Sequence, residues 1–348
     1  MSLYERIADL RLEIDGYELE RLEQPISSEF TRVTTVIRLQ GHGEEGVGED
    51  VTYAADAHPP PADLPLAGAH PLDGFSELLG RLTLFREPPA MHVFDNYRRW
   101  AFESAALDLA LRQAGRSLAD VLEREPRPVR FVVSMRFGED GIAGLRELLA
   151  RYPDTRFKLD PTPEWTDEVI AELAATGCVD SVDLKGAYVG TPVDNPPDPD
   201  LYARVAAAFP DAWIEDPALT PETERVLAPH RDRITWDAPI HSVEDIEALP
   251  FPPRTVNVKP SRFGSIRALF EAYEYCEAQG IGAYGGGQFE LGPGRGQIQA
   301  LASLFHADAP NDVAPGGYNR RPPPDGLPVS PLPPRLDARG FRRLPDGA

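Results

Sequence analysis

The sequence predicts an α/β protein in which a carboxyl-terminal (β/α) barrel of seven or eight strand–helix units carries a smaller amino-terminal α+β domain. The main observation is a set of four short apolar runs between Val179 and Gly264, each ending in an acid or a lysine. These runs are rich in β-branched and aromatic residues and precede helical segments, as parallel strands with crossover helices do. The second observation is a change at Val129, where antiparallel patterning gives way to alternating strands and helices. The 348 residues suffice for a barrel of about 250 residues with an extra lobe.

The amino-terminal domain is predicted over residues 1–126, because alternating strands are followed there by helices without a βαβ unit. Its strands are expected at 30–39 and 47–53 with a Gly-rich turn between them, and its helices at 75–85, 97–113 and 118–123. The longest helix has apolar residues at helical spacing and stops at Gly115. We therefore expect a capping domain built from a strand meander and helices.

The barrel is predicted over residues 127–319. Its strands are expected at 129–134, 156–160, 179–184, 212–215, 233–237, 254–259, 281–285 and 311–314, and its helices at 141–151, 166–176, 200–208, 221–228, 242–248, 264–279 and 295–306. Eight strands with seven intervening helices fit a modified TIM barrel whose last helix is short or replaced, whereas a flavodoxin-like open sheet has fewer strands. Residues 320–348, rich in proline and arginine, are expected to pack back on the surface.

Composition limits the partners and the compartment. The net charge of −21, from 35 basic and 56 acidic residues, argues against nucleic acid or an anionic membrane as partner, because both bind basic surfaces. No apolar run reaches the roughly 18 residues of a membrane span, and the segment after Met1 lacks the apolar core of a signal peptide. We therefore expect a cytoplasmic protein with Cys178 and Cys276 as reduced core thiols.

Three of the apolar runs end in acids that should meet. Asp183, Glu215 and Asp237 end the third, fourth and fifth predicted strands, and the carboxyl ends of parallel strands lie together at one end of a barrel. Three facing carboxylates repel one another unless they are protonated or bind a cation. Mg²⁺ takes oxygen ligands and keeps positions for water and substrate, so these acids are the predicted metal ligands. Lys259, at the end of the sixth strand, should face them across the barrel mouth.

This ordered set of strand ends resembles the enolase superfamily, in the branch that contains muconate cycloisomerase, o-succinylbenzoate synthase and dipeptide epimerases. The resemblance rests on Trp213-Ile214-Glu215-Asp216-Pro217, on Val256-Asn257-Val258-Lys259, on the helical segment that leads into the barrel and on a Gly-rich seventh strand. It implies a capping domain on a barrel, Mg²⁺ held by the three acids, and Lys259 as general base or acid. It also implies a small carboxylate substrate and a homo-oligomer.

The chain is a divergent member by this resemblance. Where the branch usually has Lys-x-Lys after the second strand, this chain has Lys158-Leu159-Asp160, so Asp160 stands where the base lysine is expected. Where the branch has Asp-x-Asn after the third strand, this chain has Asp183-Leu184-Lys185, and we hypothesise that Lys185 supplies the positive charge that Asp160 displaces. Asp237-Ala238-Pro239 replaces a pair of acids. Lys158 is either catalytic or a salt-bridge partner of Asp160 or Glu215.

The Gly-rich run after the seventh strand has two interpretations. Residues 284–296 could bind phosphate at a helix start, but we prefer a strand end that uses glycine for close approach to substrate, which makes Gln288 and Glu290 substrate-binding candidates. By the resemblance, the loops 26–30 and 53–58 of the cap close over the barrel. None of the seven histidines falls at a predicted strand end, which argues against a histidine base and against zinc.

The predicted reaction is removal of a proton from the carbon beside a carboxylate, with Mg²⁺ stabilising the negative charge that develops. Cycloisomerisation and syn-elimination need one base, whereas epimerisation needs a base on each face and is disfavoured by the loss of a lysine at Asp160. One alternative is a Schiff-base aldolase with Lys259 or Lys185 as nucleophile. Another is a catalytically impaired member that binds metal and an acid ligand, and a third is that the three acids merely cap helices.

Overall fold

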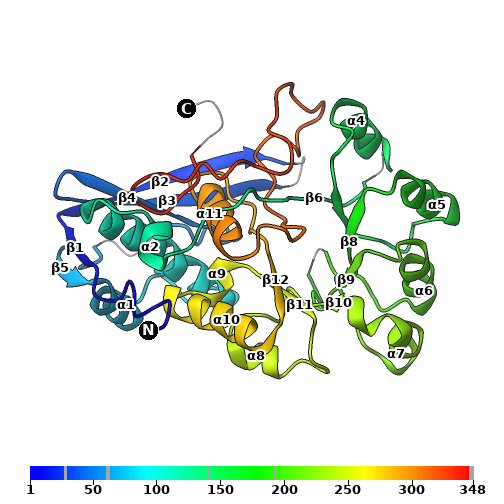
Figure 1. Ribbon diagram of the computed structural model, residues 1–348, viewed down its shortest axis with the longest axis horizontal. Coiled ribbons are helices and arrows are strands. Elements are labelled where there is room, and N and C mark those ends of the chain that lie inside the picture. The colour runs from blue at the N-terminus through cyan, green and yellow to red at the C-terminus, as the bar shows by residue number, and fades with distance from the viewer. Residues whose placement is uncertain (27–29, 60–62, 139–140, 192, 345–348) are drawn as a thin grey trace.

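The amino-terminal part of the chain is an antiparallel sheet with strand order β2-β3-β4, drawn in blue in Figure 1. The computed structural model describes residues 1–26, 30–59, 63–138, 141–191 and 193–344. The sheet contains β2 (Gly16–Pro25), β3 (Thr31–Gly41) and β4 (Glu44–Asp50), and beside it β1 (Arg11–Ile14) pairs with β5 (Gly68–Pro71). His42 and Gly43 both have positive φ, so the turn takes only two residues and the return strand begins earlier than predicted.

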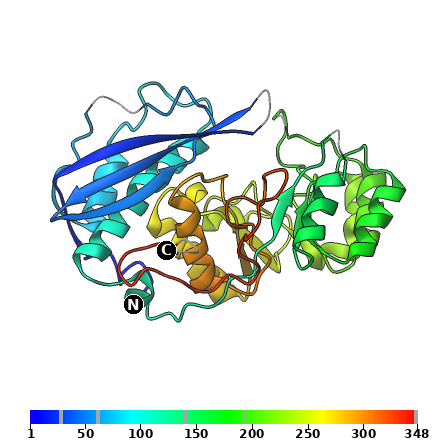
Figure 2. The same cartoon turned by 90° about the horizontal axis from the view of Figure 1, so that it is seen from above.

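Helix α2 (Val93–Gln113) packs against this sheet, with α1 (Leu72–Arg81) beside it (Figure 2) and α3 (Leu118–Leu122) following. The approach to β4 is close, because a Cβ on Gly48 would stand 2.0 Å from Ala101 O. Only glycine fits there. The predicted helix 75–85 was placed a few residues too late, since Leu82 is already extended.

Seven short parallel strands of the described chain form the barrel wall. They are β6 (Val133–Met135), β7 (Phe157–Leu159), β8 (Val179–Asp183), β9 (Trp213–Glu215), β10 (Ile234–Thr235), β11 (Thr255–Val258) and β12 (Gly282–Gly285). Strands β6 to β10 pair in chain order, and β11 pairs with β12. Where β10 meets β11, Asn257 N donates to Trp236 O at 2.9 Å. The predicted α/β barrel with an α+β cap is therefore confirmed.

Two isolated backbone bridges and an asparagine side chain occupy the eighth strand position. The predicted strand at 311–314 was wrong, because only isolated bridges form there, at Asn311 and Asp312. The side chain of Asn311 accepts from Gly285 N at 2.6 Å and donates to Arg130 O at 2.9 Å. Together with the backbone hydrogen bonds from Asp312 N to Gly285 O and from Val132 N to Asn311 O, both at 2.8 Å, these side-chain contacts join β12 to the start of the barrel without a continuous ladder.

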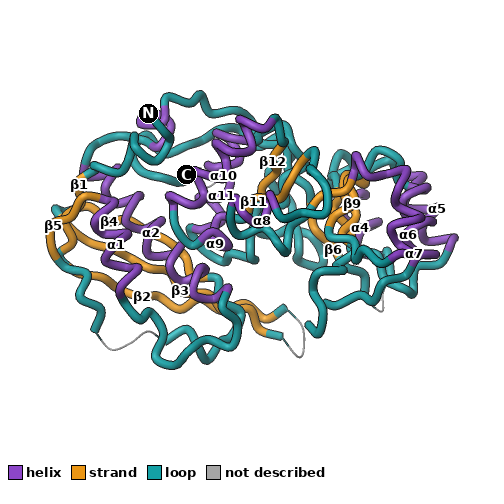
Figure 3. The backbone as a smooth tube through the Cα atoms, turned by 90° about the horizontal axis from the view of Figure 1, so that it is seen from below, coloured by secondary structure: helices purple, strands orange, loops and turns teal. Residues whose placement is uncertain are grey.

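Helices cover the outside of the strands, and Figure 3 shows α5, α6 and α7 as one outer layer. They are α4 (Ala143–Arg151), α5 (Asp167–Thr176), α6 (Pro199–Ala208), α7 (Pro221–Leu227), α8 (Val243–Glu247), α9 (Pro260–Phe263), α10 (Ile266–Gln279) and α11 (Gly294–Phe305), with a 3₁₀ helix at Ala228–Arg233. The single helix predicted from 264 is two helices, because α9 already begins at Pro260 and ends at Gly264, where φ is 72°. Ser265 then caps α10.

The carboxyl-terminal segment runs from the barrel back to the cap, in red in Figure 2. Leu332 pairs with Val129 at the base of the barrel. Buried Asp108 of α2 accepts from Phe341 N at 2.8 Å and from Arg342 Nη2 at 2.9 Å. These contacts tie the tail to both parts of a hydrophobic core that runs through cap and barrel.

Cys178 and Cys276 are buried and unpaired. Within the described ranges, no helix combines the length and the apolar character needed to cross a membrane.

Candidate active site

Three carboxylates meet at the carboxyl ends of neighbouring barrel strands. Asp183 ends β8 in register with Glu215, which ends β9, and Asp237 lies two residues beyond β10. All three side chains are fully buried, and each offers an oxygen within 4.8 Å of the others. The residues predicted as metal ligands therefore form one cluster.

Lys158 lies inside this acidic cluster. Its ammonium contacts Glu215 and is 3.1 Å from Asp183 Oδ2. Burial opposes the charged form, but Glu215 and Asp183 outweigh it and hold the pKa of Lys158 well above its ordinary value. On the other side of Glu215, the hydroxyl of Tyr284 donates to the second carboxylate oxygen at 2.5 Å. Lys158 thus forms the salt bridge with Glu215 that was one of its two predicted roles.

The two other lysines lie at opposite ends of the cluster. Lys185 Nζ is 2.5 Å from Asp183 Oδ2, at the β8 end. Lys259 Nζ is 2.8 Å from Asp237 Oδ2, at the β10 end. Because Glu215 on β9 separates these two acids, the ammonium groups flank the cluster from two sides.

Asp160 lies next to Lys185. Its Oδ2 is 3.6 Å from Lys185 Nζ, and the residue is only 7% exposed. Burial raises the pKa of Asp160 to about 6, although the Lys185 ammonium opposes this shift. The ammonium of Lys185 thus stands between the carboxylates of Asp160 and Asp183.

The carboxylates of the cluster differ in how readily they ionise. Burial opposes ionisation of Asp183, but Lys185 and Lys158 outweigh it and hold its pKa below the ordinary value. Burial and then Asp237 raise the pKa of Asp216 to about 7. The pKa of Glu215 is raised well above its ordinary value by burial, against the opposing charge of Lys158.

Two residues that the sequence did not single out hold Asp237. Arg262 on α9 donates to Asp237 Oδ1 at 2.8 Å, and Tyr188, in the loop after β8, donates to Oδ2 at 3.1 Å. Arg262 Nη2 also donates to the Tyr188 hydroxyl at 3.1 Å. Arg262 lies three residues after Lys259, and this spacing of one helical turn was an available signal. Tyr188 had no such signal in the sequence, because its loop reaches from β8 toward β10 only in the folded chain.

Asp216 shapes the backbone that carries Asp237. It has a positive φ of 47°, and its carboxylate accepts from the backbone N–H groups of Asp237 and Ala238, both at 2.8 Å. Of these two neighbouring acids, Glu215 belongs to the cluster, whereas Asp216 holds the backbone just after the next strand.

The cap covers the barrel mouth beside Gln288. Arg32, fully buried on β3, donates to Gln288 O at 2.7 Å and to Phe289 O at 3.2 Å. Its guanidinium lies 4.2 Å from the ring centroid of Tyr53, whose hydroxyl donates to Gln288 Oε1 at 3.3 Å. The Gln288 Nε2 group has no hydrogen-bond partner among the described residues. Gln288 thus offers a free donor beneath the cap loop 53–58.

The second substrate-binding candidate is turned toward its own loop. Glu290 Oε1 accepts from Gln288 N at 2.7 Å, and Arg295 Nη2 lies 3.3 Å from Oε2. Of the other cap loop, 26–30, residues 27–29 lie outside the described chain, and Ile26 N donates to Phe30 O at 2.9 Å beside them.

The start of α11 already holds an anion of the protein. The buried carboxylate of Glu49, on β4, accepts from Leu291 N at 2.6 Å, from Gly292 N at 3.0 Å and from Gly294 N at 2.9 Å. The phosphate-loop interpretation of 284–296 is therefore wrong, because a cap side chain takes the amide donors that a phosphate would need.

The donor set suits a divalent cation. Three buried carboxylates from adjacent strand ends are hard oxygen ligands of the kind that Mg²⁺ takes. Burial raises the pKa of Glu215, and a bound cation would oppose this shift by stabilising the charged carboxylate. The residues present therefore fit a metal site.

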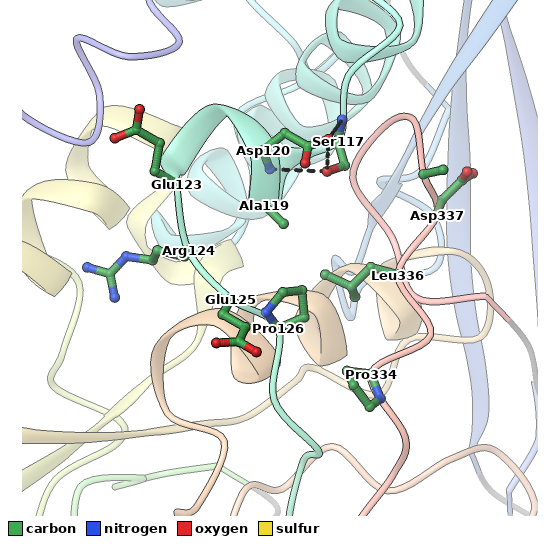
Figure 4. A pocket seen from close by; sticks show the side chains of 11 residues that line it. Ser117, Ala119, Asp120, Glu123, Arg124, Glu125, Pro126, Pro334, Leu336 and Asp337 are labelled. Carbon is green, nitrogen blue, oxygen red and sulfur yellow. Dashed lines mark hydrogen bonds between the residues drawn. The ribbon is translucent and has the colours of Figure 1, made fainter.

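Two surface cavities lie elsewhere. One of about 620 Å³ is formed by α3 and the carboxyl-terminal segment, and Figure 4 shows that Ser117 and Asp120 there hydrogen-bond to each other. Another of about 740 Å³ is lined by residues of α5 and α6 and the segment before α5. Neither contains a residue of the acidic cluster.

Comparison with known proteins agrees with this architecture. The chain is 28% identical to an N-succinylamino acid racemase of Amycolatopsis sp, over 94% of its own length and 97% of the relative. Muconate cycloisomerase from Pseudomonas fluorescens superposes with a TM-score of 0.59 at 18% identity, covering 87% of both chains. A dipeptide epimerase from Methylococcus capsulatus, crystallised with a Mg ion, superposes with a TM-score of 0.62 at 18% identity, covering 86% of this chain and 89% of that one.

These likenesses show that the chain shares the fold of muconate cycloisomerase and dipeptide epimerase. By sequence, the chain belongs to the family described as "Domain of unknown function (DUF8230)". The C-terminal domain of that family matches residues 125–320 and the N-terminal domain matches residues 5–121.

Proposed function

We propose that this protein catalyses Mg²⁺-dependent proton transfer at the carbon beside the carboxylate of a small acid, with Lys259 as base or acid. The observation that carries the proposal is the buried cluster of Asp183, Glu215 and Asp237 with Lys259 Nζ 2.8 Å from Asp237 Oδ2. Lys259 is therefore a buried ammonium at the edge of the cluster, within reach of a proton on a substrate bound there. The racemase relative, at 28% identity over nearly the whole chain, supports the same class of chemistry.

The metal ligands would be Asp183, Glu215 and Asp237. When bound there, Mg²⁺ supplies positive charge that stabilises the negative charge developing on the substrate carboxylate. Lys158 and Arg262 neutralise the carboxylates from below and from the side, so the protein does not depend on the metal alone to hold these acids together. The cap contacts the Gln288 segment at the barrel mouth through Arg32 and Tyr53.

The reaction favoured by the residues is cycloisomerisation or syn-elimination, because a single base at Lys259 suffices for either. Lys259 is 7% exposed and near enough to the cluster to take a proton from a substrate bound there. Asp160, on the side of Lys185, leaves that side without the second-strand lysine that two-base chemistry would use.

Two-base racemisation is the second candidate. Lys185 and Lys259 sit at opposite ends of the cluster, so each can serve one face of a substrate carbon. The relative named as a racemase favours this alternative. A racemase exchanges the α-proton of both enantiomers, whereas a one-base lyase or cycloisomerase consumes its substrate.

The test is α-proton exchange in D₂O with a panel of small carboxylic acids, including N-acylated amino acids, followed by NMR. Exchange that requires Mg²⁺ and is lost in Lys259→Ala supports the proposal. Exchange that persists with a chelator, or at full rate in Lys259→Ala, overturns it. Borohydride trapping of a carbonyl substrate on a lysine would instead support the aldolase. Binding of Mg²⁺ and an acid without exchange by any panel member would support the catalytically impaired alternative.

A further inference from the structure

Asp160 carries an oxygen that the protein leaves without a partner. The residue follows β7 directly, and its backbone N–H donates to Met135 O at 3.1 Å. Residues two apart on a strand share a face, so Asp160 continues the inward side of Lys158. Oδ2 is 3.6 Å from Lys185 Nζ, whereas Oδ1 is buried and accepts no hydrogen bond within the described part of the chain.

The cations around Asp160 are engaged by other groups. Arg136 donates to Val193 O at 3.0 Å and to Asn195 Oδ1 at 3.1 Å. Lys158 contacts Glu215, and Lys185 makes its shorter contact with Asp183 rather than with Asp160. A buried carboxylate oxygen that lacks a donor is destabilising, and a donor brought by a ligand recovers that free energy.

The position of this oxygen relates it to a bound substrate. Lys185 joins Asp160 to Asp183, so Asp160 Oδ1 lies on the β8 side of the acidic cluster, and Lys259 lies on the β10 side. A substrate whose carboxylate sits at the cluster would reach Lys259 with its reacting carbon and Asp160 with a neighbouring substituent. The Asp160 carboxylate would accept hydrogen bonds from that substituent and would repel an anionic one.

The geometry points to Asp160 as a specificity residue that selects a hydrogen-bond donor, a hydroxyl or an ammonium group, on the α- or β-carbon of a small carboxylic acid. This inference rests on the proposed function for the placement of the substrate carboxylate. It narrows the substrate class to hydroxy acids and amino acids, and it excludes acids with only alkyl substituents near the reacting carbon.

The experiment measures binding to the full-length protein with saturating Mg²⁺ by calorimetry. The probes are butyrate, α-hydroxybutyrate, β-hydroxybutyrate and α-aminobutyrate, which share one skeleton and differ in a single donor group. At least one donor-bearing acid is expected to bind about 10- to 100-fold more tightly than butyrate, the effect of a hydrogen bond to a charged group. Preference for the hydroxy acids or for the amino acid identifies which donor the site takes.

Asp160→Ala is expected to remove that preference while leaving the affinity for butyrate within about twofold, because only the donor contact is lost. Ser181→Ala is the matched control. Ser181 is also inward-facing, buried and without a hydrogen-bond partner among the described residues, but it lies deeper in the barrel on β8. Its loss should leave the preference intact. If Asp160→Ala does not fold, Asp160→Asn keeps the shape and is expected to lower the preference, since the acceptor is no longer charged.

Failure of every donor-bearing acid to bind more tightly than butyrate overturns the inference, whatever the variants do. A preference that survives in Asp160→Ala also overturns it, because another group would then select the donor. Exchange of α-deuterium is measured on the same probes and reports on the proposed function separately. Exchange without donor preference refutes only the role of Asp160, and donor preference without exchange refutes only the proposed reaction.

Discussion

The ammonium group of Lys185 lies 2.5 Å from Oδ2 of Asp183, the acid that ends the same strand. Lys185 has a positive φ of 56°, and its backbone N–H donates to the other oxygen of Asp183 at 3.1 Å. The backbone turn and the side chain therefore bind one carboxylate together. Lys185 therefore neutralises the Asp183 carboxylate, which a bound metal ion would otherwise neutralise.

Replacing Lys185 with methionine should make stability depend on a divalent cation. Methionine keeps an unbranched side chain but leaves Asp183 with less compensation, and breaking a buried ion pair costs about 3 to 5 kcal/mol. Thermal unfolding in a chelator should show a lowered Tm that MgCl₂ largely restores, because a ligand of the folded state stabilises it. Arg146→Met, at an exposed pair with Glu172, is the control and should leave the Tm nearly unchanged, because water screens that ion pair. An unchanged Tm in Lys185→Met would contradict the assigned ion pair.

Replacing Lys259 with alanine should abolish proton transfer without abolishing metal binding. A positioned general acid or base contributes about 10²- to 10⁴-fold to the rate, so α-proton exchange should fall by at least about 100-fold. Mg²⁺ affinity, measured by calorimetry, should persist because Asp183, Glu215 and Asp237 remain. Exchange at the wild-type rate would exclude Lys259 as the proton carrier.

Replacing Glu49 with glutamine should loosen the cap from the barrel. The glutamine amide would turn donors toward the backbone N–H groups of Leu291, Gly292 and Gly294, which now share the Glu49 carboxylate. The free energy of unfolding in urea should fall by about 2 kcal/mol, the cost of losing hydrogen bonds to a buried charged group. Glu20→Gln, at an exposed pair with Arg38, should change it by less than about 1 kcal/mol. Equal effects of the two changes would mean that Glu49 does not hold α11.

Acid should destabilise the protein partly through His306. Burial lowers the pKa of His306 to about 4, and Nδ1 donates to Asn311 Oδ1 at 2.6 Å, which leaves Nε2 to accept from the Tyr273 hydroxyl. The unfolded imidazole titrates near 6.5, so between about pH 4 and pH 6.5 only the unfolded state binds the proton. The neutral His306 therefore makes its full contribution to the free energy of unfolding above about pH 6.5. Acidification removes up to about 3 kcal/mol of that free energy.

The measurement for His306 is the free energy of unfolding as a function of pH, with NMR titration of the imidazole. His306→Gln should show a shallower loss of stability between pH 6.5 and pH 4 than the wild type, because its side chain does not titrate. Parallel curves for the two proteins would rule out His306 as the group responsible.

The barrel strands were predictable because their signal is local. Runs such as 179–184 and 254–259 are short, carry β-branched residues and have a charged residue at or next to their end, and β8 and β11 lie within those ranges. Strand ends and helix starts were less accurate, as at α9, where Lys259 is followed at once by a helical turn. Partner predictions, including the homo-oligomer, remain predictions.

The candidate site was predictable only in part. Parallel strands in chain order put Asp183, Glu215 and Asp237 at one end of a barrel, and this follows from topology alone. Arg262 could have been found from its spacing to Lys259, but Tyr188 and Glu49 were missed because their partners lie far away in the sequence. Their roles depend on which loops cross the barrel mouth, and no local pattern encodes that.

The sequence by itself determined the class of fold and the acids at the strand ends, because periodicity and strand order act over a few residues at a time. Only the tertiary structure decided where each charge is compensated. It placed Lys185 between Asp183 and Asp160, put Glu49 at the start of α11, and left Asp160 Oδ1 without a donor. Burial and pairing are properties of contacts between distant segments, so they arise only when the cap and all the strands have come together.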